Sequence, residues 1–173
     1  MKKVVVYQSG TGFTAKYAGW IAERLGCEAK EYKSVNSKEL ADYDMVIYGG
    51  WILGGMVFGY DKIKELNLKN VIVFGVGMTV PSEEIAAKIA EQNQIPRDRF
   101  YYYEGGYAPQ KVGFVKKMMV NMVMKSLKKK ENKTADELHT LETFKGADNT
   151  SKEAIEELVN QALQSGMEGK QDE

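Results

Sequence analysis

The stretch Val4-Val5-Val6-Tyr7-Gln8-Ser9-Gly10-Thr11-Gly12-Phe13-Thr14 decides how this chain folds. Its first four residues are apolar and mostly β-branched, which predicts a short strand buried on both faces, as in a parallel sheet. Two glycines follow closely. From Phe13 to Leu25 apolar residues then recur at helical spacing, and Gly26 stands where a helix C-cap is expected. The stretch therefore predicts a buried strand, a glycine turn and the start of an amphipathic helix.

The same pattern recurs along the rest of the chain. Each further strand is followed by a helix or a turn, and three of the strands end in glycines. The predicted strands cover 28–32, 45–48, 71–74 and 100–103; a short helix or turn begins at 37, and helices cover 57–66 and begin at Ser82 and Ser151. Alternating strands and helix-length crossovers predict an α/β domain with a parallel sheet covered on both faces.

Composition excludes several other classes of protein. The chain has 173 residues, 43% of them apolar and 28% charged, which is typical of one globular domain and not of a disordered or collagen-like chain. Cys27 and His139 are each single, so we expect no disulfide and no zinc site, and a cytoplasmic location. His139 is expected in a loop. No secretory signal is predicted, and the longest uncharged run, 45–60, is too short and glycine-rich to span a membrane.

The turn after the first strand carries the sharpest chemical signal. Ser9, Thr11 and Thr14 place three hydroxyls where a helix begins, beside backbone N–H groups that have no partner in the helix. Such a turn can bind a phosphate monoester without a cationic side chain. Two alternatives stay open: a simple capped helix start, and a dinucleotide fingerprint formed by Gly10, Gly12 and Ala15 with Glu31 further on. A P-loop is excluded because its motif, Gly-x-x-x-x-Gly-Lys-Ser/Thr, is absent.

Two further glycine-rich segments follow buried strands, at 49–55 and 75–78. Because the carboxyl ends of parallel strands meet at one edge of a sheet, these segments are expected to converge with the first turn. Three glycine-rich loops at one edge indicate a flat ligand that the backbone approaches closely.

The motif Ser9-x-Thr11-Gly12-x-Thr14 after a first strand resembles the phosphate loop of flavodoxins. The resemblance implies a flavodoxin-like, doubly wound, five-stranded parallel sheet in the order 2-1-3-4-5, with FMN as cofactor. It also implies a set of FMN-binding residues, in which Trp51 stacks on the flavin ring. These are Ser9, Gly10, Thr11, Gly12, Phe13, Thr14, Gly50, Trp51, Ile52, Leu53, Gly54, Gly75, Val76, Gly77 and Met78. No residue of the chain is assigned a catalytic acid, base or nucleophile.

The three loops differ from those of typical flavodoxins in charge. Residues 9–16, 49–60 and 75–81 contain no Asp or Glu, whereas typical flavodoxins are acidic around the flavin. Without nearby carboxylates the reduced, anionic flavin is repelled less. The resemblance therefore implies a redox potential less negative than that of a typical flavodoxin.

An insert of about residues 107–149 follows the fifth strand, and residues 111–130 within it hold seven lysines and no acid. Gly105-Gly106, Tyr107, Pro109 and the lysine-rich Met/Val segment resemble the flavodoxin-type protoporphyrinogen IX dehydrogenases, which are quinone-linked. From the residues alone, 111–130 predicts a basic amphipathic helix. Its apolar side (Val112, Val115, Met118, Met119, Met122, Val123, Leu127) would contact an anionic membrane surface, the domain itself or a second copy of the chain. Nucleic acid is not expected, because the lysines alternate with apolar residues and the rest of the chain is acidic.

These observations lead to one domain over 1–165, with a flexible tail at 166–173. The preferred hypothesis is an FMN-dependent redox protein that exchanges electrons with a partner protein or a quinone-type acceptor. The alternatives are a quinone-linked dehydrogenase of the protoporphyrinogen type and a non-catalytic binding module on the same fold.

Overall fold

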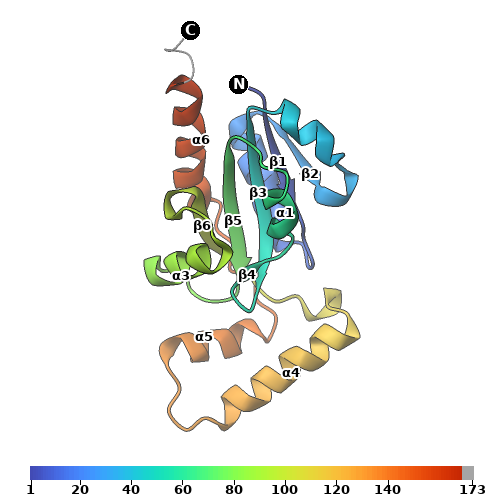
Figure 1. The fold of residues 1–173 in the computed structure, drawn as a ribbon. Helices are drawn as coiled ribbons and strands as arrows, with labels where there is room; N and C mark the ends of the chain where they lie inside the picture. The colour runs from blue at the N-terminus through green and yellow to red at the C-terminus, as the bar shows by residue number, and fades with distance from the viewer. Residues whose placement is uncertain (169–173) are drawn as a thin grey trace.

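The computed structural model describes residues 1–168, without the side chains of residues 115, 116, 119 and 166–168. Its sheet has five parallel strands in the order β2-β1-β3-β5-β6, and a short strand β4 pairs antiparallel with β3 (Figure 1). The strands are β1 (Lys3–Tyr7), β2 (Glu28–Glu31), β3 (Met45–Leu53), β4 (Met56–Val57), β5 (Val71–Gly77) and β6 (Phe100–Glu104). Because the fourth and fifth predicted strands are β5 and β6, the predicted order 2-1-3-4-5 is confirmed.

Helices cover both faces of the sheet, as the sequence predicts. The α-helices are α1 (Phe13–Leu25), α2 (Tyr60–Lys64), α3 (Glu83–Asn93), α4 (Phe114–Lys129), α5 (Ala135–Thr143) and α6 (Glu156–Glu168). Short 3₁₀ turns lie at Tyr32–Ser34, Ser37–Asp42, Arg97–Arg99, Pro109–Lys111 and Glu153–Ile155. One apolar core joins α1 and α6 to the sheet, and a second joins α2 and α3 to its other face.

The first crossover forms as predicted because its signals are local. α1 begins at Phe13 after Gly12, whose φ of 105° lies in the left-handed region that favours glycine. It ends at Leu25, and Gly26 closes it with its N–H bonded to the carbonyls of the last turn. In α3, the Ser82 hydroxyl accepts a hydrogen bond from the Ile85 N–H, which is the expected N-cap.

Two predicted glycine loops are strand residues in the structure. β3 continues through Gly50 to Leu53, and β5 continues through Gly75 to Gly77. The reason is close packing: a Cβ on Gly49 would lie 2.0 Å from the Phe74 ring, and one on Gly75 would lie 2.6 Å from Ile52 Cδ1. These glycines therefore make room for neighbouring side chains within the sheet.

The helix predicted over 57–66 is wrong at its start. Val57 pairs with Ile52 in the β3–β4 hairpin, and α2 is confined to Tyr60–Lys64. The hairpin turns at Gly54 and Gly55, which both have positive φ (58° and 81°), as a tight hairpin turn requires. A Gly-Gly pair between apolar runs is itself a hairpin signal, so the sequence contained the evidence.

The insert forms two helices, α4 and α5, which lie beyond one end of the sheet (Figure 1). Val112 precedes α4, so it is not on the helical face predicted for it. The prediction that His139 lies in a loop is wrong, because it lies in α5. The last helix begins later than predicted, at Glu156, and reaches Glu168; residues 169–173 of the predicted tail lie outside the described residues. Within residues 1–168, no helix is long and apolar enough to span a bilayer.

Candidate functional site

A cavity of about 920 Å³ opens at the carboxyl ends of β1, β3 and β5. It brings together most of the predicted site residues, from three separate loops. These are Gly10, Thr11, Phe13, Thr14, Trp51, Ile52, Leu53, Gly54, Val76, Gly77 and Met78. Ser9, Gly50 and Gly75 do not line it, and Gly12 lines a second, adjoining cavity. The convergence predicted for the three loops is therefore found, with Gly50 and Gly75 serving the packing of the sheet.

One end of the cavity is formed by the first turn of α1. Ser9 is used within the turn, where its hydroxyl oxygen accepts a hydrogen bond from the Gly12 N–H at 3.0 Å. Thr14 is only 2% exposed, and among the described residues neither its hydroxyl nor that of Thr11 has a hydrogen-bond partner. The first turn of α1 contains no acid. Unpaired hydroxyls beside the amides of a helix N-terminus suit an anionic group such as a phosphate.

The other end of the cavity is apolar and is formed by the β3–β4 hairpin. Trp51 stacks on Phe58 with ring centroids 4.4 Å apart, so Phe58 supports the ring that the sequence assigned to flavin stacking. Lys88 is the one charged residue in the described lining, which contains no Asp or Glu. The absence of acids noted in the sequence thus applies to the three-dimensional site as well.

Sequence reasoning missed Asn93, which holds this hairpin in place. Its side chain is 94% buried; its Oδ1 accepts a hydrogen bond from the Val57 N–H at 2.9 Å, and its Nδ2 donates to the Gly55 carbonyl at 2.8 Å. The neighbouring Gln92 donates a more exposed bond to the Gly54 carbonyl. The signal was present, because an asparagine stands on the inward face of the predicted third helix.

The end of β5 is held by Tyr102. Its hydroxyl donates to the Thr79 carbonyl at 3.0 Å and accepts from the Thr79 N–H at 3.1 Å. Burial raises the pKa of Tyr102 above its ordinary value, despite the opposing bonds to Thr79, so the phenol stays protonated at neutral pH and can keep donating. Tyr102 therefore fixes the chain just after Met78.

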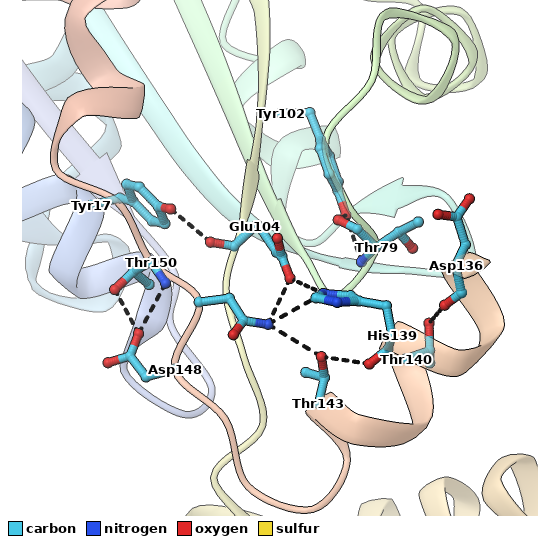
Figure 2. A network of polar contacts seen from close by, with 11 residues as sticks. Tyr17, Thr79, Tyr102, Glu104, Asp136, His139, Thr140, Thr143, Asp148 and Thr150 are labelled. Carbon is cyan, nitrogen blue, oxygen red and sulfur yellow. Dashed lines mark hydrogen bonds and ion pairs between the residues drawn. The ribbon is translucent and has the colours of Figure 1, made fainter.

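A polar network joins the insert to the last strand (Figure 2). The Glu104 carboxylate lies 2.5 Å from His139 Nε2 and accepts a hydrogen bond from Asn149 Nδ2 at 2.6 Å. Asn149 also donates to the Thr143 hydroxyl, and the Tyr17 hydroxyl donates to the Glu104 carbonyl. The single histidine of the chain thus secures α5 against β6.

Residues of the insert also line the main cavity, and the sequence analysis did not predict this. Lining residues absent from the predicted set are Gly55, Thr79, Ile85, Lys88, Ile89, Gln92, Tyr102, Gly106, Tyr107, Val112, Val120, Val123 and Phe144. Tyr107, Val112, Val120, Val123 and Phe144 belong to the insert, and all of them except Tyr107 are wholly apolar. The cavity thus has loops of the sheet on one side and the insert on the other.

The topology, the unpaired hydroxyls at a helix N-terminus and the apolar cavity beside them define an α/β protein built to bind an aromatic mononucleotide. A flavodoxin domain family model matches residues 4–134, so the chain belongs to the flavodoxin domain family. Family membership supports FMN as the cofactor, and the residues at both ends of the cavity fit its phosphate and its ring.

Several solved structures are similar to this chain. Oxidised flavodoxin 2 from Bacillus cereus is 25% identical, with 68% of this chain and 92% of that chain covered and a TM-score of 0.45. A flavodoxin from the domain Archaea is 15% identical, with 84% and 97% covered and a TM-score of 0.44. A flavoprotein in complex with FMN from Lactobacillus acidophilus is 14% identical, with 60% and 90% covered and a TM-score of 0.39. A comparison with curated proteins found no match.

Proposed function

We propose that this protein is a cytoplasmic FMN-dependent redox protein that transfers electrons between a donor and an acceptor. The main observation behind the proposal is that one cavity combines a polar end with an apolar end. The unpaired Thr11 and Thr14 hydroxyls lie at one end, and the apolar hairpin with Trp51 lies at the other. Bound FMN would supply the reversible uptake and release of electrons. The chain would bind and orient the cofactor and would limit the access of water to it.

Each part of the chain has a distinct task in this proposal. Thr11, Thr14 and the first amides of α1 would bind the phosphate, since the positive end of the helix dipole favours an anion. Trp51, supported by Phe58, would pack against the flavin ring, an aromatic contact that adds about 0.5–1.5 kcal/mol beyond the buried area. The end of β5 and the following Met78 would face the edge of the ring.

Titration of the flavin-free chain with FMN tests the proposal. We expect quenching of FMN fluorescence on binding, and Kd values about 10–100-fold higher for Thr11→Ala and for Thr14→Ala, because each removes a hydrogen bond to a charged group. Ser126→Ala, an exposed hydroxyl on α4, is the matched control and should leave the Kd unchanged. A chain that never quenches FMN fluorescence would favour the non-catalytic binding module instead.

A second candidate is a quinone-linked dehydrogenase, of which the protoporphyrinogen IX type is one example. The observation favouring it is the apolar wall that the insert adds to the cavity through Val112, Val120, Val123 and Phe144. At about 920 Å³ the cavity is near the upper end of the range for small-molecule sites, so a flat apolar reactant could lie beside the ring. Turnover with a porphyrinogen and a quinone, measured against the Val123→Asp variant, separates this candidate from a pure electron carrier.

We further propose that the insert contacts an anionic membrane surface. Phe114 is 82% exposed and Met122 is 66% exposed, with Met118 and Val123 also exposed on α4. Lys117, Lys125, Lys128 and Lys129 are exposed on the same helix. Each lysine near an anionic surface contributes about 1 kcal/mol of attraction, which salt weakens. The side chains of Val115 and Met119, predicted for the same face, lie outside the described residues.

Co-sedimentation with vesicles containing anionic lipid tests this contact. We expect binding at low salt, loss of binding to neutral vesicles, and weaker binding of Phe114→Ser together with Met122→Ser. Absence of binding to anionic vesicles at low salt, together with a concentration-dependent dimer in sedimentation, would indicate that α4 instead joins two copies of the chain.

A further inference from the structure

A lysine of the insert lies against the phosphate-binding turn. The ammonium nitrogen of Lys111 is 3.6 Å from the position that a Cβ on Gly12 would occupy, although the two residues are far apart in the sequence. Both residues line the second cavity, of about 450 Å³, which shares Thr11, Phe13 and Tyr107 with the lining of the main one. The N-terminal end of α1 thus has a cationic side chain that the loop itself does not contain.

The charged residues of this second cavity are not equally free to bind an anion. Lys16 donates to Asp148 Oδ2 at 2.8 Å and to the Thr150 hydroxyl at 2.7 Å. Lys145 donates to Glu142 Oε1 at 2.5 Å. Lys111, by contrast, has no ion pair or side-chain hydrogen bond within the part of the chain that the structure describes.

The negative charge in the second cavity is already balanced. Asp148 is its one described acid, and its carboxylate is engaged by Lys16 and by Thr150. Burial would raise the pKa of Asp148, but the hydrogen bonds from Lys16 and Thr150 together outweigh it and lower that pKa, so the carboxylate stays ionised and keeps its ion pair with Lys16. An anion at Gly12 would therefore face the unpaired Lys111 rather than Lys16.

The position of Lys111 is set by the base of the insert. Its N–H donates to the Ala108 carbonyl at 2.9 Å within the 3₁₀ turn Pro109–Lys111. The preceding segment is paired with the end of the insert, because the Tyr107 N–H donates to the Ala147 carbonyl and the Asn149 N–H donates to the Gly105 carbonyl, each at 2.9 Å. Lys111 is thus placed by backbone bonds that hold both ends of the insert together.

We propose that Lys111 pairs with the phosphate of FMN and makes the site specific for the phosphorylated flavin, an inference that rests on the proposed FMN function. A phosphate monoester carries about −1.5 to −2 charges at neutral pH. The unpaired Thr11 and Thr14 hydroxyls and the first amides of α1 would donate hydrogen bonds to its oxygens, and Lys111 would neutralise part of its charge. Because Lys111 belongs to the insert, the same contact links cofactor binding to the base of the insert that covers the cavity.

Riboflavin and FMN differ only in the phosphate, so their comparison isolates this contact. The flavin-free full-length chain is titrated with each ligand and followed by fluorescence quenching at about 0.01 M and about 1 M salt. The variants are Lys111→Gln, which removes the charge, and Lys111→Glu, which reverses it. Lys125→Gln is the matched control, because Lys125 is an exposed insert lysine that lines neither cavity.

At low salt we expect Lys111→Gln to raise the Kd for FMN about tenfold and Lys111→Glu to raise it more, while the Kd for riboflavin changes less than about twofold. At about 1 M salt, where the screening length is about 3 Å, the difference between the variants and the unchanged chain should largely disappear. The control should match the unchanged chain with both ligands.

Two results would overturn the proposal while leaving the FMN function intact: equal FMN affinity in all variants, or a parallel loss of FMN and riboflavin affinity. If the unchanged chain binds neither flavin, the proposed function fails and this inference fails with it.

Discussion

The hairpin that carries Trp51 depends on one buried side chain, and its removal gives the sharpest test of the structure. Asn93→Ala deletes the acceptor of the Val57 N–H and the donor to the Gly55 carbonyl. It also deletes a bond to the Ile89 carbonyl of α3. Val57 is only 3% exposed, so water cannot easily replace the lost partner of its N–H.

The magnitude follows from these contacts. An unsatisfied buried backbone group costs about 1–3 kcal/mol, and a second lost hydrogen bond costs about 1 kcal/mol more. We therefore expect Asn93→Ala to lower the free energy of unfolding by about 2–4 kcal/mol. For a chain of this length that corresponds to a Tm lower by about 5–15 °C. FMN affinity should fall as well, because the hairpin carries Trp51.

Urea unfolding followed by circular dichroism measures this change. Gln92→Ala is the matched control, since it removes one exposed bond to the Gly54 carbonyl, and we expect it to cost less than about 1 kcal/mol. If Asn93→Ala and Gln92→Ala destabilise the chain equally, Asn93 does not hold the hairpin and the reasoning is refuted.

Three further predictions concern other parts of the molecule. Tyr103 is 3% exposed and its hydroxyl has no hydrogen-bond partner among the described residues. Tyr103→Phe should therefore leave the free energy of unfolding unchanged or raise it by about 1 kcal/mol. A clearly lower free energy of unfolding in urea would reveal a hydrogen bond to the hydroxyl. Glu104→Ala removes the partner of His139 and Asn149, and should increase hydrogen exchange in α5 more than in α1; equal exchange would contradict the role of the network. The described lining of the cavity holds Lys88 and no acid, so the flavin of the FMN-bound chain should have a redox potential less negative than that of typical flavodoxins. Spectroscopic potentiometry measures this potential, and a value more negative than that of typical flavodoxins would contradict the reasoning.

The part of the fold that the sequence predicts best is its repeated local unit. α1 occupies the predicted range Phe13–Leu25, and Gly26 forms its cap. The reason is that a buried apolar run, a glycine turn and a helical period each act over a few neighbouring residues. The predictions of five strands, of their order in the sheet and of three loops meeting at one edge are also confirmed.

The β3–β4 hairpin was predicted incorrectly because two local signals competed. Apolar residues after Gly55 are compatible with a helix as well as with a strand. The strand forms because Val57 pairs with Ile52 and because the Val57 N–H donates to the buried Asn93 side chain of α3. The sequence assigns Gly50 and Gly75 to the ligand. In the structure a Cβ on Gly50 would lie 2.6 Å from the Phe58 carbonyl oxygen and one on Gly75 would lie 2.6 Å from Ile52 Cδ1, so both glycines also permit close packing within the sheet.

By itself, the amino-acid sequence determined the alternation of strands and helices and the hydroxyl-rich turn that begins α1, since both depend on residues close together in the chain. Only the tertiary structure decided what surrounds that turn. Lys16 meets Asp148 across 132 positions, and His139 meets Glu104 across 35. Lys111, which lies at the base of the insert, is likewise close to Gly12. Such contacts depend on how the insert folds back onto the sheet. The spacing of neighbouring residues in the sequence does not predict which distant residues meet in this way.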